Sequence, residues 1–182
     1  MAAREGGKKR AAAQATGRVD IAVSVPCRHW RRALPDVEHV VTAAARAALR
    51  GAASVPARRR AAELSLVLAG DALVRNLNRR WRGRDQATNV LSFPAGPAAG
   101  AAGPILLGDV VLAYETVAHE AEAQGKSLAA HLSHLVTHGV LHLLGFDHET
   151  DDEARRMEGL ERRILARLGV ADPYRAREVA HG

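Results

Sequence analysis

The sequence has little of several things, and each shortage excludes a class of protein. A single cysteine, Cys27, rules out an intrachain disulfide framework, and we interpret it as a structural residue. No stretch of about 20 apolar residues occurs, so we expect no membrane-spanning helix and no membrane partner. The N-terminus lacks the apolar segment of a secretion signal, which favours a cytoplasmic protein. Aromatic residues make up only 3% of the chain, so leucine, valine and alanine must build the core.

Positive charge is what the chain has in excess. The formal net charge is +6 and the sequence pI is about 10.4. A basic balance favours polyanionic partners such as nucleic acid. The many arginines also resemble the coding bias of a GC-rich genome, so charge alone is a modest argument.

The patterning predicts one α+β domain. We expect a disordered basic tail over residues 1–18, a folded domain over 19–175 and a C-terminal tail over 176–182. Strands are predicted at 21–25, 63–69, 88–93 and 105–112, with a loop at 95–104. Helices are predicted at 35–50, 71–81, 114–124, 127–144 and 151–168, with Asp71 and Ser127 as caps. Trp81 is predicted to anchor its helix in the core; the alternative is that it stacks on a base. The result is a small mixed sheet of about four strands covered by about five helices.

The strongest signal is the segment HGVLHLLGFDH at residues 138–148. His138 and His142 are four residues apart in a predicted helix, so both imidazoles lie on one face and can reach one ion. Gly145 permits a sharp turn that can return His148 to the same ion. Three imidazole ligands leave a fourth position open, as in catalytic rather than structural zinc sites. The alternative is three histidines scattered on and after a buried helix.

The spacing also matches the metzincin signature H-E-x-x-H-x-x-G-x-x-H except at one position. Gly139 stands where those peptidases carry the glutamate that acts as general base. The segment therefore predicts a zincin-like metal helix with a substrate other than a peptide.

Three residues near the three histidines could have more than one role. His131 and His134 precede His138 by two turns and one turn, and they are either ordinary helix residues or groups that support the site. Asp147 either orients a ligand or forms the turn.

A second feature is a group of five arginines within residues 75–84: Arg75, Arg79, Arg80, Arg82 and Arg84. The planar guanidinium can bind two phosphate oxygens, and near a metal it can offset charge in a phosphoryl transition state. The alternative for any one of them is a solvated helix end, where cations complement the helix dipole.

With these residues in view, the chain resembles the YbeY family of bacterial endoribonucleases, also described as rRNA maturation factors. Residues 138–148 match the family motif H-G-x-L-H-L-x-G-[YF]-D-H in full. Residues 77–94 resemble L-N-x-x-[YW]-R-x-x-D-x-x-T-[DN]-V-L-S-F-P, and residues 107–112 match L-G-D-[IV]-x-[IL]. The acidic start of the last helix and residues 172–174 also fit. The resemblance covers roughly residues 20–175 of this sequence.

The resemblance implies a single-strand-specific, metal-dependent endoribonuclease that acts in 16S rRNA 3′-end maturation and late-stage ribosome quality control. It implies one Zn²⁺ per chain on His138, His142 and His148, and it singles out Arg82 as a functional, catalytic residue. It implies single-stranded RNA, the small ribosomal subunit, one of its proteins and an assembly GTPase as partners. Two alternatives stay open: another zinc hydrolase, and an assembly factor with structural zinc and little nuclease activity.

Overall fold

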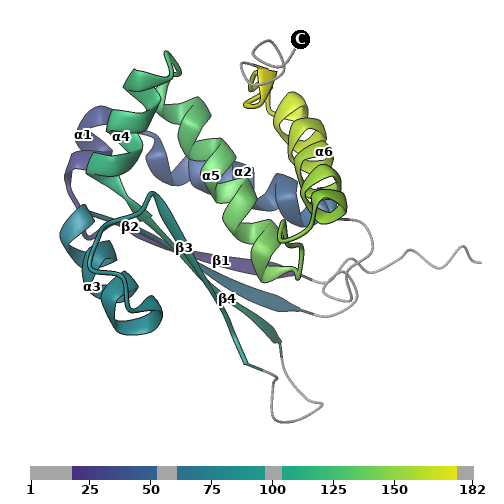
Figure 1. Ribbon diagram of the computed structural model, residues 1–182, viewed down its shortest axis with the longest axis horizontal. Coiled ribbons are helices and arrows are strands. Elements are labelled where there is room, and N and C mark those ends of the chain that lie inside the picture. Colours follow the sequence, from purple (N-terminus) through teal and green to yellow (C-terminus); the bar gives the residue numbers. More distant parts are fainter. Residues whose placement is uncertain (1–17, 53–60, 97–103, 176–182) are drawn as a thin grey trace, which may run out of the picture.

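The computed structural model describes residues 18–52, 61–96 and 104–175, which form one sheet with helices on both faces (Figure 1). The strands lie in the order β1-β2-β4-β3. β1, β2 and β4 run parallel, and β3 pairs antiparallel with β4 at one edge. Their bounds are β1 (Val19–Ser24), β2 (Ala62–Ala69), β3 (Val90–Pro94) and β4 (Ile105–Ala113). The predicted α+β domain with a four-stranded mixed sheet is confirmed. Residues 1–17 and 176–182 of the expected tails, and 97–103 of the expected loop, lie outside the described residues.

All five predicted helices are present, with ends that differ from the prediction by only a few residues. They are α2 (Val37–Gly51), α3 (Asp71–Arg82), α4 (Tyr114–Ala123), α5 (Leu128–Leu143) and α6 (Asp151–Arg167). A sixth, α1 (His29–Ala33), was not predicted because five residues are too few to show a helical period. Its Trp30 is fully buried and donates its indole N–H to the Ala69 carbonyl oxygen at 2.9 Å.

The two faces of the sheet bury separate apolar clusters. Because successive strand residues point to opposite faces, Val110 and Leu112 of β4 join the main core with α2, α5 and α6. Val111 and Ala113 join a smaller cluster with Val74 of α3. α3 lies on the opposite side of the sheet from α2, α5 and α6 (Figure 1). In the described part of the chain, no helix is both long and apolar enough to cross a membrane.

The prediction that Trp81 anchors the core is wrong. Its side chain is 64% exposed, and its ring lies 6.2 Å from that of Phe93. α3 buries only Val74 and Asn78, because the cluster beneath it is small. Trp81 lies beyond that narrow face, at the exposed end of the helix.

Asp71 caps a different helix from the one predicted. Gly70 is the N-cap of α3, and Asp71 is the first helical residue. The Asp71 carboxylate instead accepts hydrogen bonds from the backbone N–H and hydroxyl of Thr116, at 3.1 and 2.8 Å, in the first turn of α4. Glu115 in turn accepts from the backbone N–H of Asp71 at 2.8 Å, so the two helix starts cap each other. The predicted cap at Ser127 is confirmed, since its hydroxyl accepts from the Ala130 backbone N–H.

Candidate metal centre

Two histidines of the candidate centre lie on the last turns of α5. His138 and His142 are four residues apart, and their Nε2 atoms lie 3.0 Å from each other. Two ligands of a tetrahedral zinc ion would be separated by about 3.3 Å, so the rings already face one common point. Both side chains are half-buried.

The turn after α5 brings in the third histidine. The backbone N–H groups of Gly145 and Phe146 donate to the carbonyl oxygens of His142 and Leu141, at 3.0 and 3.1 Å. With φ of +86° at Gly145, this is a Schellman motif, which ends the helix and reverses the chain. The His148 ring then lies 5.6 Å from the His138 ring and 5.0 Å from the His142 ring.

The three histidines fit a metal ion. One ring nitrogen of each lies within 4.8 Å of the others. Burial, followed by the charges of His138 and His148, lowers the pKa of His142, which favours the neutral imidazole that binds metals. The structure therefore brings His138, His142 and His148 together in an arrangement that can hold one divalent ion.

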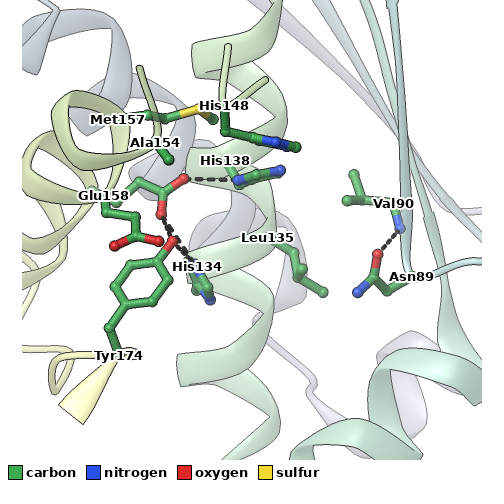
Figure 2. Close-up of a pocket in the computed structure, with 11 residues that line it drawn as sticks. Asn89, Val90, His134, Leu135, His138, His148, Ala154, Met157, Glu158 and Tyr174 are labelled. Carbon is green, nitrogen blue, oxygen red and sulfur yellow. Dashed lines mark hydrogen bonds and ion pairs between the residues drawn. The ribbon is translucent and has the colours of Figure 1, made fainter. Parts of the chain in front are cut away.

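Two adjoining pockets meet at these histidines. The first, shown in Figure 2, has a volume of about 360 Å³ and is lined by Leu135, Met157 and Tyr174 among others. The second has a volume of about 530 Å³ and is lined by Arg82, Ser92 and the three histidines among others. Asn89, Val90, His138 and His148 line both pockets, so an extended ligand could pass the histidines from one pocket to the other.

The arginines of α3 and the following loop differ in their surroundings. Arg82 is exposed and lines the second pocket together with the histidines. Arg75 instead forms a two-bond ion pair with Asp85, at 2.8 and 2.9 Å, which lowers the pKa of that carboxyl. Arg80 lies over the Trp81 ring at 5.7 Å. Only Arg82 of the five predicted arginines lines this pocket.

The close packing of Gly139 against the sheet explains why no glutamate follows the first histidine of this helix. A Cβ atom at this position would lie 2.7 Å from Val110 Cγ1 and 3.1 Å from Ser92 Oγ. The residue is buried against the sheet and does not face the pocket. A glutamate would have no space there.

The structure also places the residues whose roles were open. His131 is buried and bonds Glu120 at 2.8 Å, and burial lowers its pKa despite that bond. His134 lies 3.3 Å from a carboxylate oxygen of Glu161 and lines the first pocket. Asp147 accepts from the backbone N–H of His148 at 2.8 Å, a local bond that fits the turn-forming alternative, and it also lines the second pocket.

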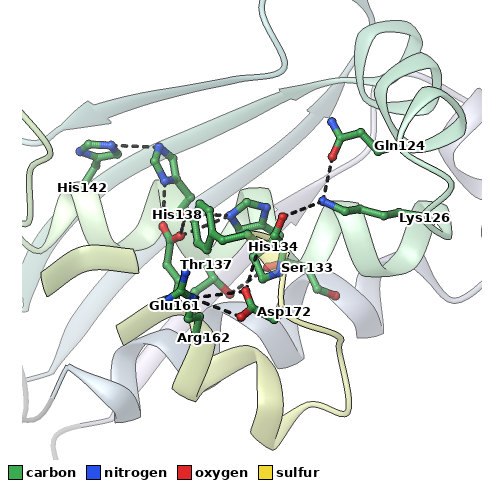
Figure 3. Close-up of polar contacts among 12 residues, drawn as sticks. Gln124, Lys126, Ser133, His134, Thr137, His138, His142, Glu161, Arg162 and Asp172 are labelled. Carbon is green, nitrogen blue, oxygen red and sulfur yellow. Dashed lines mark hydrogen bonds and ion pairs between the residues drawn. The ribbon is translucent and has the colours of Figure 1, made fainter. Parts of the chain in front are cut away.

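Glu161 of α6 is the neighbour that sequence reasoning missed. Its side chain is fully buried, and its Oε1 lies 2.8 Å from the Nδ1 of His138 (Figure 3). Burial raises the pKa of this carboxyl, but hydrogen bonds from His134, His138 and Tyr174 outweigh it and bring the pKa to about 2. A signal was available, because Glu161 interrupts a helical stripe of apolar residues: Met157, Leu160, Ile164 and Leu165.

A second group with metal-binding side chains lies elsewhere. One ligand atom each of Cys27, His29 and Glu115 falls within 4.8 Å of the others. Glu115 already caps the first turn of α3, which accounts for its position. A pocket of about 530 Å³ borders His29 and Glu115 as well. The three histidines are the better candidate because two pockets meet at them and none of their rings caps a helix.

Fold and site together define an α+β protein with a group of three histidines, on one helix and the turn after it, that could hold a metal ion. The family model described as endoribonuclease YbeY matches residues 30–169, and this chain belongs to that family. Proteins named endoribonuclease YbeY from Paramagnetospirillum magneticum and Rhizobium meliloti are 54% and 50% identical to it. Each match covers 86% of this chain, with 96% and 95% of the relative.

A solved structure shares the fold. The solution structure of TM1509 from Thermotoga maritima superposes with a TM-score of 0.50 and 18% identity. The match covers 85% of this chain and 98% of that one.

Proposed function

We propose that this protein is a single-strand-specific metallo-endoribonuclease that acts in 16S rRNA 3′-end maturation and late-stage ribosome quality control. One observation carries the proposal: in a member of the YbeY family, His138, His142 and His148 converge at a pocket that Arg82 also lines. We propose one Zn²⁺ per chain as the cofactor, since three imidazoles and an open side are typical of catalytic zinc sites.

Each residue of the centre has a proposed part. A divalent ion held by the three histidines would activate water and polarise the phosphodiester. Arg82 would bind oxygens of the scissile phosphate and offset the negative charge that develops during cleavage, which makes it the proposed catalytic residue. Its position at the exposed end of α3 leaves the guanidinium accessible to a phosphate from solvent.

The two adjoining pockets support an RNA strand as substrate. They meet at His138 and His148, so a strand that fills both would present its backbone to the metal ligands. The exposed Arg79, Arg80 and Arg84 lie near Arg82 in the sequence and would attract the strand, so binding should weaken as salt rises. Arg75 would attract the strand less than the other arginines, because its charge is neutralised by the ion pair with Asp85.

The proposed partners follow from the family. They are single-stranded 16S rRNA, the small ribosomal subunit, one of its proteins and a GTPase of subunit assembly, all in the cytoplasm. A peptidase function is disfavoured because Gly139 replaces the required base and packs against the sheet.

Cleavage of a labelled single-stranded rRNA fragment tests the proposal. Wild-type protein is compared with His142→Ala and Arg82→Ala, and bound metal is quantified in each. His39→Ala and Arg46→Ala serve as controls, since both side chains are exposed on α2 and line neither pocket. If the histidine variant fails to cut but still supports ribosome maturation in cells, the assembly-factor alternative replaces the nuclease proposal.

A further inference from the structure

Glu161 is a carboxylate in an apolar setting. It lies in the interior of α6 with 0% of its surface exposed, next to the buried Leu160 and Ile164. A charged group is buried in this way only when partners offset the loss of its hydration. The partners of Glu161 therefore indicate why the residue is there.

Those partners connect the carboxylate to the metal centre. Oε1 lies 2.8 Å from His138 Nδ1, and Oε2 lies 3.3 Å from His134 Nε2 (Figure 3). Oε2 also accepts a hydrogen bond from the Tyr174 hydroxyl. An ionised carboxylate only accepts hydrogen bonds, so the proton of a neutral His138 must be on Nδ1. The lone pair is then on Nε2, the atom that faces His142.

We propose that Glu161 is a positioning residue for the metal centre, which fixes the tautomer and ring orientation of His138 so that Nε2 is available to the ion. The inference rests on the proposed metal site. Carboxylates that accept from the far nitrogen of a metal-binding histidine commonly have this effect. Tyr174 holds the same carboxylate from the segment after α6, so the end of the described chain also supports the centre.

A purely structural role makes a different prediction. Glu161 also ties α6 to α5 and to the segment at Tyr174, so its loss could lower stability without any effect on metal binding. Tyr174→Phe separates the two roles, because it removes the hydrogen bond between Tyr174 and Glu161 but leaves the bond between Glu161 and His138. Glu158→Gln is the matched control for zinc affinity: Glu158 lies one turn earlier on the same helix and also lines the first pocket, but no described hydrogen bond joins it to His138.

The first readout is metal affinity without RNA. Metal-free wild type, Glu161→Ala, Glu161→Gln, Tyr174→Phe and Glu158→Gln are titrated with Zn²⁺ against a chromophoric chelator. We expect Glu161→Ala to bind zinc about 10–100-fold more weakly, the loss typical of such supporting groups. Glu161→Gln should bind more tightly than Glu161→Ala, since its amide oxygen can still accept from Nδ1. Glu158→Gln and Tyr174→Phe should stay within about twofold of wild type.

The second readout is the His138 tautomer in metal-free protein, measured by ¹⁵N-detected imidazole NMR. We expect the Nδ1–H form in wild type and a shift towards Nε2–H in Glu161→Ala. If Glu161→Ala does not fold, Glu161→Gln provides the test, and its zinc affinity should be lower than that of wild type. Unchanged affinity and tautomer in the folded variants would overturn the inference, as would wild type that binds no zinc. Wild type that binds zinc in this Glu161-dependent way but cuts no RNA would contradict only the nuclease proposal.

Discussion

Gly139 of α5 packs against Val110 of β4 so closely that a Cβ atom at position 139 would lie 2.7 Å from Val110 Cγ1. The Ser92 hydroxyl also donates to the Gly139 carbonyl oxygen, at 3.2 Å. The helix and the sheet therefore touch beside His138, the first proposed metal ligand. With residue 139 directed at the sheet, His138 is directed at the pocket.

This contact predicts that Gly139→Ala destabilises the fold. Val110 is a branched strand residue and cannot move aside, so we expect the free energy of unfolding to fall by about 1–3 kcal/mol in urea denaturation. Gly159→Ala is the control, because a Cβ there meets only the flexible end of Arg163, at 3.6 Å. Within a helix that change should stabilise by about 0.5–1 kcal/mol. Equal effects of the two substitutions would show that the close contact is unimportant.

The turn at Gly145 gives a second prediction. Gly145 and Gly169 both follow a helix with positive φ, +86° and +71°, and both donate within Schellman-type turns. Alanine at either position should lower stability by about 1–2 kcal/mol, because an L-residue is strained there. Only Gly145→Ala should also weaken zinc binding, since it alone precedes His148. Equal zinc affinities in the two variants would contradict this account of the turn.

Arg82 provides a test of phosphate binding. We expect Arg82→Ala to lower kcat/KM for RNA cleavage by about 10²-fold, the scale of removing one charge-stabilising donor from an active site. Arg82→Lys should recover only part of that loss, because it keeps the charge but not the planar fork. Bound zinc should be unchanged in both variants. Wild-type kcat/KM in Arg82→Ala would remove Arg82 from the mechanism.

Glu161 predicts a pH dependence of stability in metal-free protein. Its folded pKa of about 2 lies below the ordinary value of 4.5, so its contribution is present above about pH 4.5 and is lost as pH falls towards 2. Between about pH 6 and about pH 3, the stability difference between wild type and Glu161→Gln should shrink by roughly 2 kcal/mol. Urea denaturation at both pH values measures it. A difference independent of pH would show that the Glu161 carboxylate is not preferentially stabilised in the fold.

Much of the fold was predictable because its elements are locally encoded. The histidine helix, its Ser127 cap and its Gly145 turn follow from spacing and from residue types with strong conformational preferences. The four strands were recognised by their apolar runs between loop residues.

The parts that sequence did not predict depend on contacts between distant segments. Trp81 was expected in the core because it follows Leu77 by four residues, on the apolar side of the predicted helix. The cluster under α3 is too small to cover it. Asp71 binds a helix start 45 residues away, and Glu161 meets His138 across two helices. Periodicity on one helix contains no information about which partner the facing element supplies.

Cleavage of a labelled single-stranded rRNA fragment tests most directly whether the three histidines form a nuclease site. Wild type and His142→Ala are each assayed as isolated, after chelation and after zinc is restored. If the histidine centre is the nuclease site, wild type should contain about one metal ion per chain, its cleavage should be lost on chelation and recovered with zinc, and the variant should not cleave. Equal cleavage by wild type and His142→Ala, or full activity of metal-free protein, would contradict the claim that this histidine centre is the nuclease site.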